Sequence, residues 1–258
     1  MWNRSFAKYE GAGNDFVLVD DRSLVFPIHP ILIQGLCDRK FGVGADGVIL
    51  LQLDPKADFR MRIFNRDGGE AEGCGNGLRC LARFLLDLGL PPKPYRVVVH
   101  NRIVELEYRE DLIRVEMGEP KDLALHLKTE AGAVHFVDTG VPHAVLFVED
   151  VTAAPLSELG PFLRHHPLFH PRGANANLAS LQPDGSIRVR TFERGVEEET
   201  LACGTGACAV AVIAASLFGL SGPVRISYQG GDLEVGFQGS KIFMTGPAKR
   251  VFEGKFLL

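Results

Sequence analysis

Short stretches in which apolar and polar residues alternate dominate the chain, and they predict a protein rich in β-strands. Successive side chains of a strand point to opposite faces, so alternation at every second residue marks a strand with one buried face. Turn-forming pairs such as Glu110-Asp111 and Asp184-Gly185 separate these stretches. The pattern predicts strands over residues 16–19, 48–51, 59–64, 95–100, 103–108, 112–117, 145–148, 187–192, 224–228, 233–237 and 241–244.

Two segments have helical periodicity instead. Apolar side chains recur at 78, 81, 84, 85 and 88 within residues 76–88, and Gly89 with the prolines at 91 and 92 ends that pattern. Residues 205–220 are apolar nearly all round, which predicts a helix buried on most sides. Each half of the chain therefore contains many strands and one central helix. We expect an α+β fold in which each half is a curled, mostly antiparallel sheet wrapped around its helix.

The two halves also match each other in sequence. Residues 61–77 (MRIFNRDGGEAEGCGNG) parallel residues 189–206 (VRTFERGVEEETLACGTG), and their cysteines, Cys74 and Cys203, are 129 residues apart in a chain of 258. Further matches keep the same order: 13–21 with 140–150, 43–50 with 172–179, and 104–120 with 231–247. These matches predict a duplication that gives two pseudo-symmetric domains. We expect one domain over residues 1–122, joined by the tail 248–258, and another over 123–247, meeting around residues 122–134.

Composition narrows the classes of partner. The formal net charge is −4, whereas nucleic-acid and anionic-membrane surfaces need basic patches. The first residues, MWNRSFAKYEG, lack the apolar core of a signal peptide, and no run of about 18 apolar residues occurs. We therefore expect a cytoplasmic protein that binds neither nucleic acid nor membranes.

The five cysteines fall into two groups. They are irregularly spaced and contain no CxxC pair, so no metal site is expected. Cys37, Cys80 and Cys208 are expected to be buried core residues. Cys74 and Cys203 differ, because each directly precedes the glycine-rich start of its half's central helix.

A helix start gives a cysteine two chemical properties. The free N–H groups and the positive end of the helix dipole lower the pKa of the thiol below its ordinary value of about 8.5. The same N–H groups can bind a carboxylate. Duplicated domains bring equivalent sites together across a pseudo-two-fold axis, so we expect Cys74 and Cys203 to face one cleft. One thiolate would remove a proton from a carbon and the opposite thiol would return one to the other face, which is racemisation or epimerisation. The alternative interpretations of Cys74 and Cys203 are a redox-switch disulfide and a metal site formed by their thiolates.

Five motifs make the chain similar to a known family. The stretches KYEGAGNDFVLVD, RKFGVGADGVIL, MRIFNRDGGEAEGCGNGLRC, DTGVPHAV and ERGVEEETLACGTGACA resemble those of the diaminopimelate epimerases, which are pyridoxal-independent isomerases. The resemblance implies interconversion of LL- and meso-2,6-diaminopimelate for lysine and peptidoglycan synthesis. It implies no cofactor, and by analogy a homodimer.

The resemblance also implies roles for individual residues. Cys74 and Cys203 would be the two catalytic bases, and His143 and Glu193 would tune their pKa values. The helix-start residues Gly75, Asn76, Gly204 and Thr205 would hold the carboxylate at the reacting centre. The distal end of the substrate is a zwitterion, for which amides, a carboxylate and a guanidinium are suitable partners. Its holders would be Asn14, Asn65, Asn175, Glu193 and Arg194; Asn177 is an alternative to Asn175 in the ANAN stretch.

The chain departs from the common family pattern at three places. Val141 stands where many members have an asparagine, Gly47 stands where some have glutamine, and the segment from Glu193 to Cys203 is one residue longer than in some relatives. The loss of a polar group at 141 bears on substrate specificity. The alternatives are therefore a racemase of the proline or hydroxyproline type and, in a different class, a non-catalytic thiol-switch protein.

Overall fold

The computed structural model describes residues 5–256 and divides the chain into two compact units. The first unit comprises the chain up to Val115 together with the segment from Gly246, and the second comprises Glu116–Thr245. Both boundaries fall within strands.

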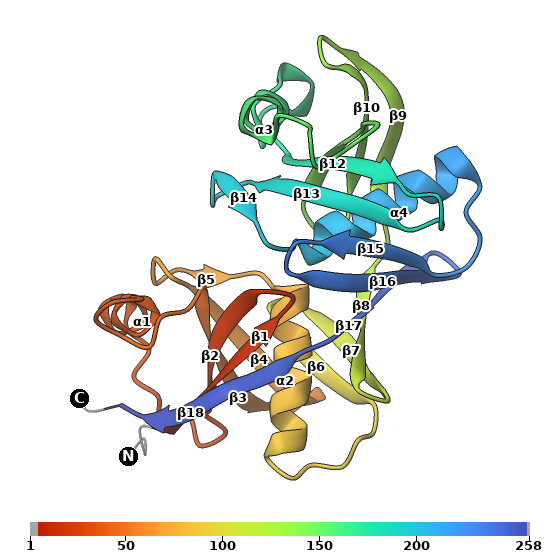
Figure 1. The fold of residues 1–258 in the computed structure, drawn as a ribbon. Coiled ribbons are helices and arrows are strands. Elements are labelled where there is room, and N and C mark those ends of the chain that lie inside the picture. Colours follow the sequence, from red (N-terminus) through yellow and green to blue (C-terminus); the bar gives the residue numbers. More distant parts are fainter. Residues whose placement is uncertain (1–4, 257–258) are drawn as a thin grey trace. The chain divides into compact units, whose positions relative to one another are not determined.

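The same order of helices and strands occurs twice along the chain (Figure 1). The first set is β1 (Ser5–Gly11), β2 (Asn14–Asp20), α1 (Pro30–Cys37), β3 (Gly47–Asp54), β4 (Ala57–Asn65), β5 (Glu70–Ala71), α2 (Gly75–Asp87), β6 (Tyr95–Val99), β7 (Arg102–Arg109), β8 (Leu112–Gly118) and β9 (Lys121–Thr129). The second set is β10 (Gly132–Asp138), β11 (Pro142–Phe147), α3 (Leu156–Arg164), β12 (Asn175–Leu181), β13 (Ile187–Glu193), β14 (Glu198–Thr200), α4 (Gly204–Phe218), β15 (Val224–Tyr228), β16 (Gly231–Gln238), β17 (Lys241–Gly246) and β18 (Lys249–Lys255). A short 3-10 turn, Pro167–Phe169, is an addition to the second set. The α+β class and the duplication are confirmed.

Strand pairing is also the same in the two units. Most neighbours are antiparallel, but β2–β3 and β4–β6 are parallel in the first unit. The equivalent pairs β11–β12 and β13–β15 are parallel in the second. Parallel neighbours need a crossover connection, and the four crossovers contain α1, α2, α3 and α4. Each central helix therefore lies in the connection between two parallel strands of its sheet.

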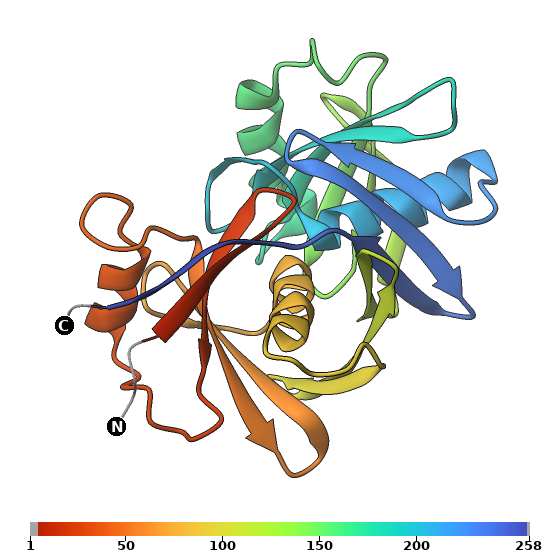
Figure 2. The same ribbon diagram turned by 60° about the horizontal axis from the view of Figure 1, so that its bottom comes forward.

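The last strand of each set belongs to the unit that is otherwise built by the other set. β9 lies in the second unit and β18 lies in the first. β9 pairs with β10, and β18 pairs antiparallel with β1, from Ser5 opposite Lys255 to Glu10 opposite Lys249. Figures 1 and 2 show β18 beside β1, although they lie at opposite ends of the sequence. The buried Arg79 of α2 also donates from Nε to the carbonyl of Pro247 (3.1 Å), just before β18. Residues 122–134 lie within the β9–β10 hairpin of the second unit.

The two central helices lie within a residue or two of the segments that the sequence pattern predicted. α2 is buried on nearly all sides from Gly75 to Ala82, more than the single apolar stripe predicted, because Asn76 and Arg79 are buried as well. It ends at Asp87, and Gly89 just beyond it has a φ of 83°, which suits glycine. α4 buries nearly every residue from its start to Ala214 and ends at Gly219 in the left-handed conformation, with φ 64°. Both helices begin directly after their cysteine.

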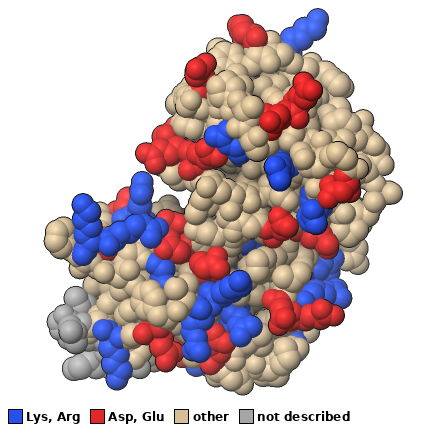
Figure 3. All heavy atoms as spheres, in the orientation of Figure 1, with Lys and Arg blue, Asp and Glu red and all other residues tan. Residues whose placement is uncertain are grey.

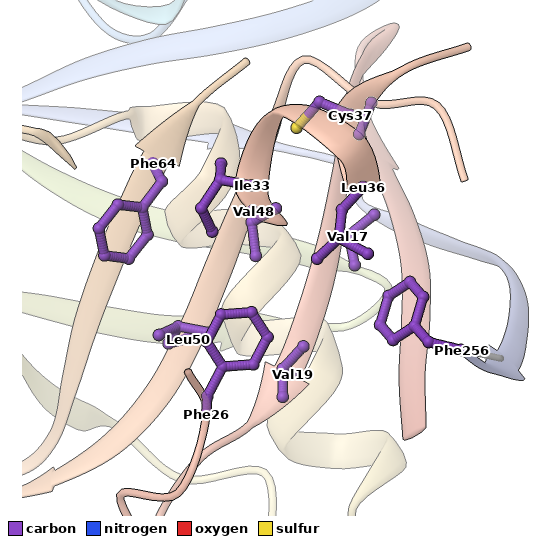
Figure 4. Packing of buried hydrophobic residues seen from close by; sticks show 11 residues of the cluster. Val17, Val19, Phe26, Ile33, Leu36, Cys37, Val48, Leu50, Phe64 and Phe256 are labelled. Atoms are coloured by element: carbon purple, nitrogen blue, oxygen red, sulfur yellow. The ribbon is translucent and has the colours of Figure 1, made fainter. Parts of the chain in front are cut away.

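The sequence pattern missed two shorter helices, α1 and α3. α1 has only eight residues, and α3 contains Gly160 and Pro161, so neither shows a clear helical stripe. In the first unit, Ile33 and Leu36 of α1 pack against residues of β2 and β3 such as Val17 and Leu50 (Figure 4). In the second unit, α3 contributes Leu156 and Leu163 to a matching apolar cluster. Each unit therefore has a second core on the outer face of its sheet.

Charged side chains of both signs are interspersed over the face shown in Figure 3. Within residues 5–256 no helix is both long enough and apolar enough to cross a membrane.

Candidate active site

The first half-site is built around the start of α2. Cys74 has an extended backbone, with φ −153° and ψ 120°, and the helix begins at Gly75. Its Sγ accepts a hydrogen bond from the N–H of Gly77 at 3.4 Å. The N–H groups of the first helical turn lack partners within the helix, so this turn is suited to bind a carboxylate. The sequence places the thiol and this anion-binding turn together because the cysteine is the N-cap.

Asn14 lies beside Cys74 in the same unit. It begins β2, and its Oδ1 accepts from the Cys74 thiol (3.5 Å) and from Nδ2 of Asn76 (3.2 Å). Its Nδ2 donates to Oδ2 of Asp46 at 2.7 Å. The structure therefore brings Asn14, predicted as a distal holder, into contact with a predicted base. Sequence reasoning missed Asp46, which lies 129 residues before Asn175 and so occupies the matching place in the duplication.

Asn65 is separate from this cluster of hydrogen bonds. It ends β4 with an exposed side chain, and its backbone closes a turn by bonding to Gly68 and Gly69. An exposed amide at the end of a strand is available to a ligand.

The second half-site is built around the start of α4. Cys203 is the N-cap, with φ −125° and ψ 111°, and its Sγ lies 3.5 Å from Oγ1 of Thr205. Its carbonyl accepts from the hydroxyl of Tyr228 at 3.1 Å. The carbonyl of Thr205 accepts from Oγ1 of the buried Thr139 at 2.8 Å. Sequence reasoning missed Tyr228 and Thr139, because their roles depend on contacts distant along the chain.

Buried amides connect His143 to the end of β13. Nδ2 of Asn177 lies 3.2 Å from Nδ1 of His143, and Oδ1 of Asn175 accepts from the backbone N–H of Arg194 at 2.8 Å. Both asparagines are buried on β12, two residues apart and so on one face. Asn175 therefore positions the backbone of Arg194, whereas Asn177 lies deeper in the core.

His143 itself is completely buried. Burial, reinforced by the nearby charge of Arg194, lowers the pKa of its imidazole to about 3. The ring is therefore neutral at physiological pH, so it can influence its surroundings through hydrogen bonds but not through a positive charge.

Glu193 is the last residue of β13, and Arg194 is the first residue of the loop that follows. Oε2 of Glu193 accepts from Oγ1 of Thr200 (2.8 Å), and Nη1 of Arg194 donates to the carbonyl of Arg172 (3.4 Å). Glu197 and Glu199 follow in the same loop, and both are ion-paired while remaining partly exposed. Glu197 accepts from Arg164 and from the N–H of Gly195, and Glu199 accepts two bonds from Arg190. The ion pairs fix the loop that carries Glu193 and Arg194.

The other cysteines are core residues. Cys37, Cys80 and Cys208 are buried. Burial raises the pKa of Cys37 to about 11, and burial raises that of Cys80 further still. Cys37 and Cys80 are therefore thiols at neutral pH. Within residues 5–256, no group of three or more His, Cys, Asp or Glu side chains is arranged to hold a metal ion.

Solved structures define the class of fold. The chain is similar to a PhzF-family phenazine biosynthesis protein of Bacillus anthracis, with a TM-score of 0.79, 17% identity and coverage of 100% of both chains. It is also similar to a hydroxyproline epimerase from Agrobacterium vitis, with a TM-score of 0.72 and 18% identity, covering 99% of this chain and 92% of that one. At these identities the similarity establishes the fold alone.

Sequence comparisons establish the family. The family model for diaminopimelate epimerase matches residues 6–123 and 135–251. The diaminopimelate epimerase of Synechocystis sp. is 43% identical, over 97% of this chain and 98% of that protein. The diaminopimelate epimerase of Ralstonia nicotianae is 41% identical, over 96% and 94%. The chain belongs to the diaminopimelate epimerase family, as its motifs predicted.

Proposed function

We propose that this protein is an epimerase that interconverts LL- and meso-2,6-diaminopimelate. The observation that carries the proposal is the repeated cysteine N-cap: two thiols, Cys74 and Cys203, each at the start of a central helix in units that match element by element. Membership of the diaminopimelate epimerase family supports the substrate. The enzyme class is an isomerase.

The proposed reaction needs one base for each face of the α-carbon. One thiolate takes the α-proton while the opposite thiol delivers a proton to the other face, so the configuration inverts. The substrate α-carboxylate would accept hydrogen bonds from the first turns of α2 and α4, at Gly75, Asn76, Gly204 and Thr205. Those N–H groups stabilise the negative charge that develops when the α-carbon loses its proton. The chemistry requires no cofactor.

The distal amino-acid end would be held by groups that suit a zwitterion. The guanidinium of Arg194 suits the carboxylate, while Glu193, Asn65 and the amide cluster around Asn175 suit the ammonium. The ion pairs of Glu197 and Glu199 support this assignment because they immobilise the loop in advance. Pre-ordering reduces the entropy lost on binding.

Proton exchange in D₂O tests the function directly. The enzyme is incubated under reducing conditions with LL-diaminopimelate and, separately, with L-proline, and α-deuteration is followed by NMR. We expect exchange and epimerisation with diaminopimelate alone. Exchange with proline alone would indicate a proline-type racemase, and exchange with neither would leave only a non-catalytic thiol protein.

Serine variants test the two bases. We expect Cys74→Ser and Cys203→Ser each to lower the epimerisation rate by at least about 10²-fold, because a hydroxyl is a far weaker base. Cys37→Ala is the matched control, since it removes a buried thiol that takes no part in the reaction. Retention of activity by both serine variants would rule out the two-base mechanism.

The setting of the enzyme is also a proposal. Thiol chemistry at Cys74 and Cys203 requires a reducing compartment, which supports the cytoplasm. Analogy with the family supports a homodimer, and light scattering in solution measures its mass.

A further inference from the structure

The amide of Asn14 has a defined orientation between Cys74 and Asp46. A carboxylate can only accept hydrogen bonds, so the Asn14 NH₂ group must face Asp46, to which it donates at 2.7 Å. The carbonyl of the same amide must then face Cys74, whose Sγ lies 3.5 Å from Oδ1. Nδ2 of Asn76 donates to the same oxygen at 3.2 Å, which agrees with this orientation. Asp46 thus decides which end of Asn14 meets the thiol.

Asp46 is itself held in place by charge. Its Oδ1 pairs with Arg39 at 2.9 Å, and its Oδ2 accepts from the N–H of Asp15 at 3.2 Å. Asp15 pairs with both Arg39 (2.7 Å) and the buried Lys8 (2.7 Å). Burial opposes ionisation of Asp15, but the hydrogen bonds from Arg39 and Lys8 prevail and lower its pKa. These contacts fix the carboxylate that orients Asn14.

The hydrogen bonds at the sulfur distinguish thiol from thiolate. The N–H of Gly77 donates to Sγ at 3.4 Å, while Oδ1 of Asn14 is positioned to accept from it. A thiol can accept one bond and donate the other, so it satisfies both neighbours. A thiolate would place its negative charge against the carbonyl oxygen of Asn14.

We propose that Asp46 is a positioning residue that, through the Asn14 amide, keeps Cys74 as a thiol in the substrate-free enzyme. This inference rests on the proposed two-base epimerisation and assigns the starting roles within it. In the direction that begins from this state, Cys74 is the acid and Cys203 is the base; the reverse direction begins with the two protonation states exchanged. The α-carbon–hydrogen bond breaks with its proton passing to the Cys203 thiolate, and the Cys74 S–H bond breaks as its proton passes to the opposite face. No oxidation or reduction occurs.

The second half-site is built differently at the matching positions. The duplication matches Asn14 with Val141, which has no acceptor, and Asp46 with Asn175. Asn76 is matched by Thr205, whose hydroxyl lies 3.5 Å from the sulfur of Cys203 and can donate to a thiolate. Because the Val141 side chain has no hydrogen-bond acceptor, the proposed stabilisation of the thiol form applies to Cys74 and not to Cys203.

Alkylation by iodoacetamide measures the proposed bias without substrate. The thiolate attacks the reagent and iodide leaves, so the rate follows the thiolate fraction. Cys74 is measured across pH in a Cys203→Ser background, and Cys203 in a Cys74→Ser background, so that the two titrations stay separate. Labelled peptides are quantified by mass spectrometry, and circular dichroism confirms that each variant is folded. We expect the midpoint of the pH profile to lie higher for Cys74 than for Cys203.

A double-mutant cycle separates amide orientation from charge. Asn14→Leu removes the acceptor and leaves only the N–H donor, so we expect a midpoint lower by about one pH unit and alkylation about tenfold faster below it. Asp46→Asn frees the amide to turn and should also lower the midpoint. The double variant should match Asn14→Leu alone. Asp58→Asn, which alters a carboxylate bonded to the N–H of Arg96, is the control and should change nothing.

Three results would overturn the proposal. They are a Cys74 midpoint below that of Cys203, an Asp46→Asn variant with the wild-type midpoint, or an Asp46→Asn shift that persists in the Asn14→Leu background. The last would show that the charge of Asp46 acts without Asn14. The deuterium exchange described above tests the epimerase function separately, so a failure of one is distinguishable from a failure of the other.

Discussion

The third residue of each cysteine helix is a glycine, and replacing the two glycines should have unequal effects. Gly77 and Gly206 occupy the same position in α2 and α4, so Gly77→Ala and Gly206→Ala are the same change in two copies of one motif. Alanine favours a helix over glycine by about 0.5–1 kcal/mol. That gain is common to both variants, so the difference between them comes from what the new methyl group contacts.

The neighbours of the two glycines differ in kind. A Cβ at Gly77 would lie 2.9 Å from Cδ1 of Ile49 and 3.4 Å from Cδ1 of Ile63, which are the ends of flexible side chains. A Cβ at Gly206 would lie 2.7 Å from Oδ1 of Asn177 and 3.1 Å from the hydroxyl of Tyr228. Both of those oxygens are fixed by hydrogen bonds inside the core.

The expected free energies follow from these contacts. Overpacking costs about 1–3 kcal/mol, and the isoleucine ends at Gly77 can move, so Gly77→Ala should stay within about 1 kcal/mol of wild type. Oδ1 of Asn177 accepts from Thr191 at 2.8 Å, and Tyr228 donates to the Cys203 carbonyl. Displacing a buried bond of this kind costs about 1–3 kcal/mol more. Gly206→Ala should therefore lose about 2–4 kcal/mol, which corresponds to about 5–15 °C in Tm.

Thermal unfolding followed by circular dichroism, with urea unfolding beside it, measures the difference. Each variant is compared with wild type at the same pH and protein concentration. Equal losses in the two variants, or a larger loss for Gly77→Ala, would refute the argument that the fixed polar atoms around Gly206 decide the cost.

Three further predictions concern the second unit. The pKa of His143 is about 3 in the folded state and about 6.5 unfolded, so the unfolded chain binds more protons between these values and stability falls as the pH decreases from 6.5. In urea unfolding, the free energy of unfolding of wild type should fall by about 2 kcal/mol between pH 6.5 and pH 5. His143→Asn should largely abolish this fall, and a variant with the pH dependence of wild type would contradict the buried neutral ring. Glu197→Gln weakens the ion pair with Arg164 and should raise KM several-fold with little change in kcat, because the loop carrying Arg194 is less ordered; steady-state kinetics test this, and an unchanged KM would contradict it. Val141→Asn supplies an amide at a position where the family resemblance implies a substrate contact. It should lower KM for diaminopimelate about fivefold, for one added hydrogen bond of about 1 kcal/mol; a raised KM would count against a substrate contact at this position.

The two helix starts of the candidate site were predictable because each is a local feature of the sequence. A cysteine followed by glycines and an apolar helical stretch is an N-cap wherever it folds, so Cys74 and Cys203 could be found from the chain alone. The orientation of Asn14 could not, because Asp46 is 32 residues away and meets it only through the parallel pairing of β2 with β3. The charge state of His143 also depends on burial by distant strands.

The duplication, the two central helices and most of the strands could be predicted from the chain alone, since each is a periodic or repeated pattern within a short stretch. The sequence does not show that β18 pairs with β1 or that β9 pairs with β10, because alternation identifies a strand but not its neighbour. The tertiary structure also shows which contacts the differing residues at matching positions make. Asn14 and Val141 occupy matching positions in the duplication. Asn14 is hydrogen-bonded to Asp46, whereas Val141 has an apolar side chain and precedes Pro142, so the two half-sites differ in chemistry.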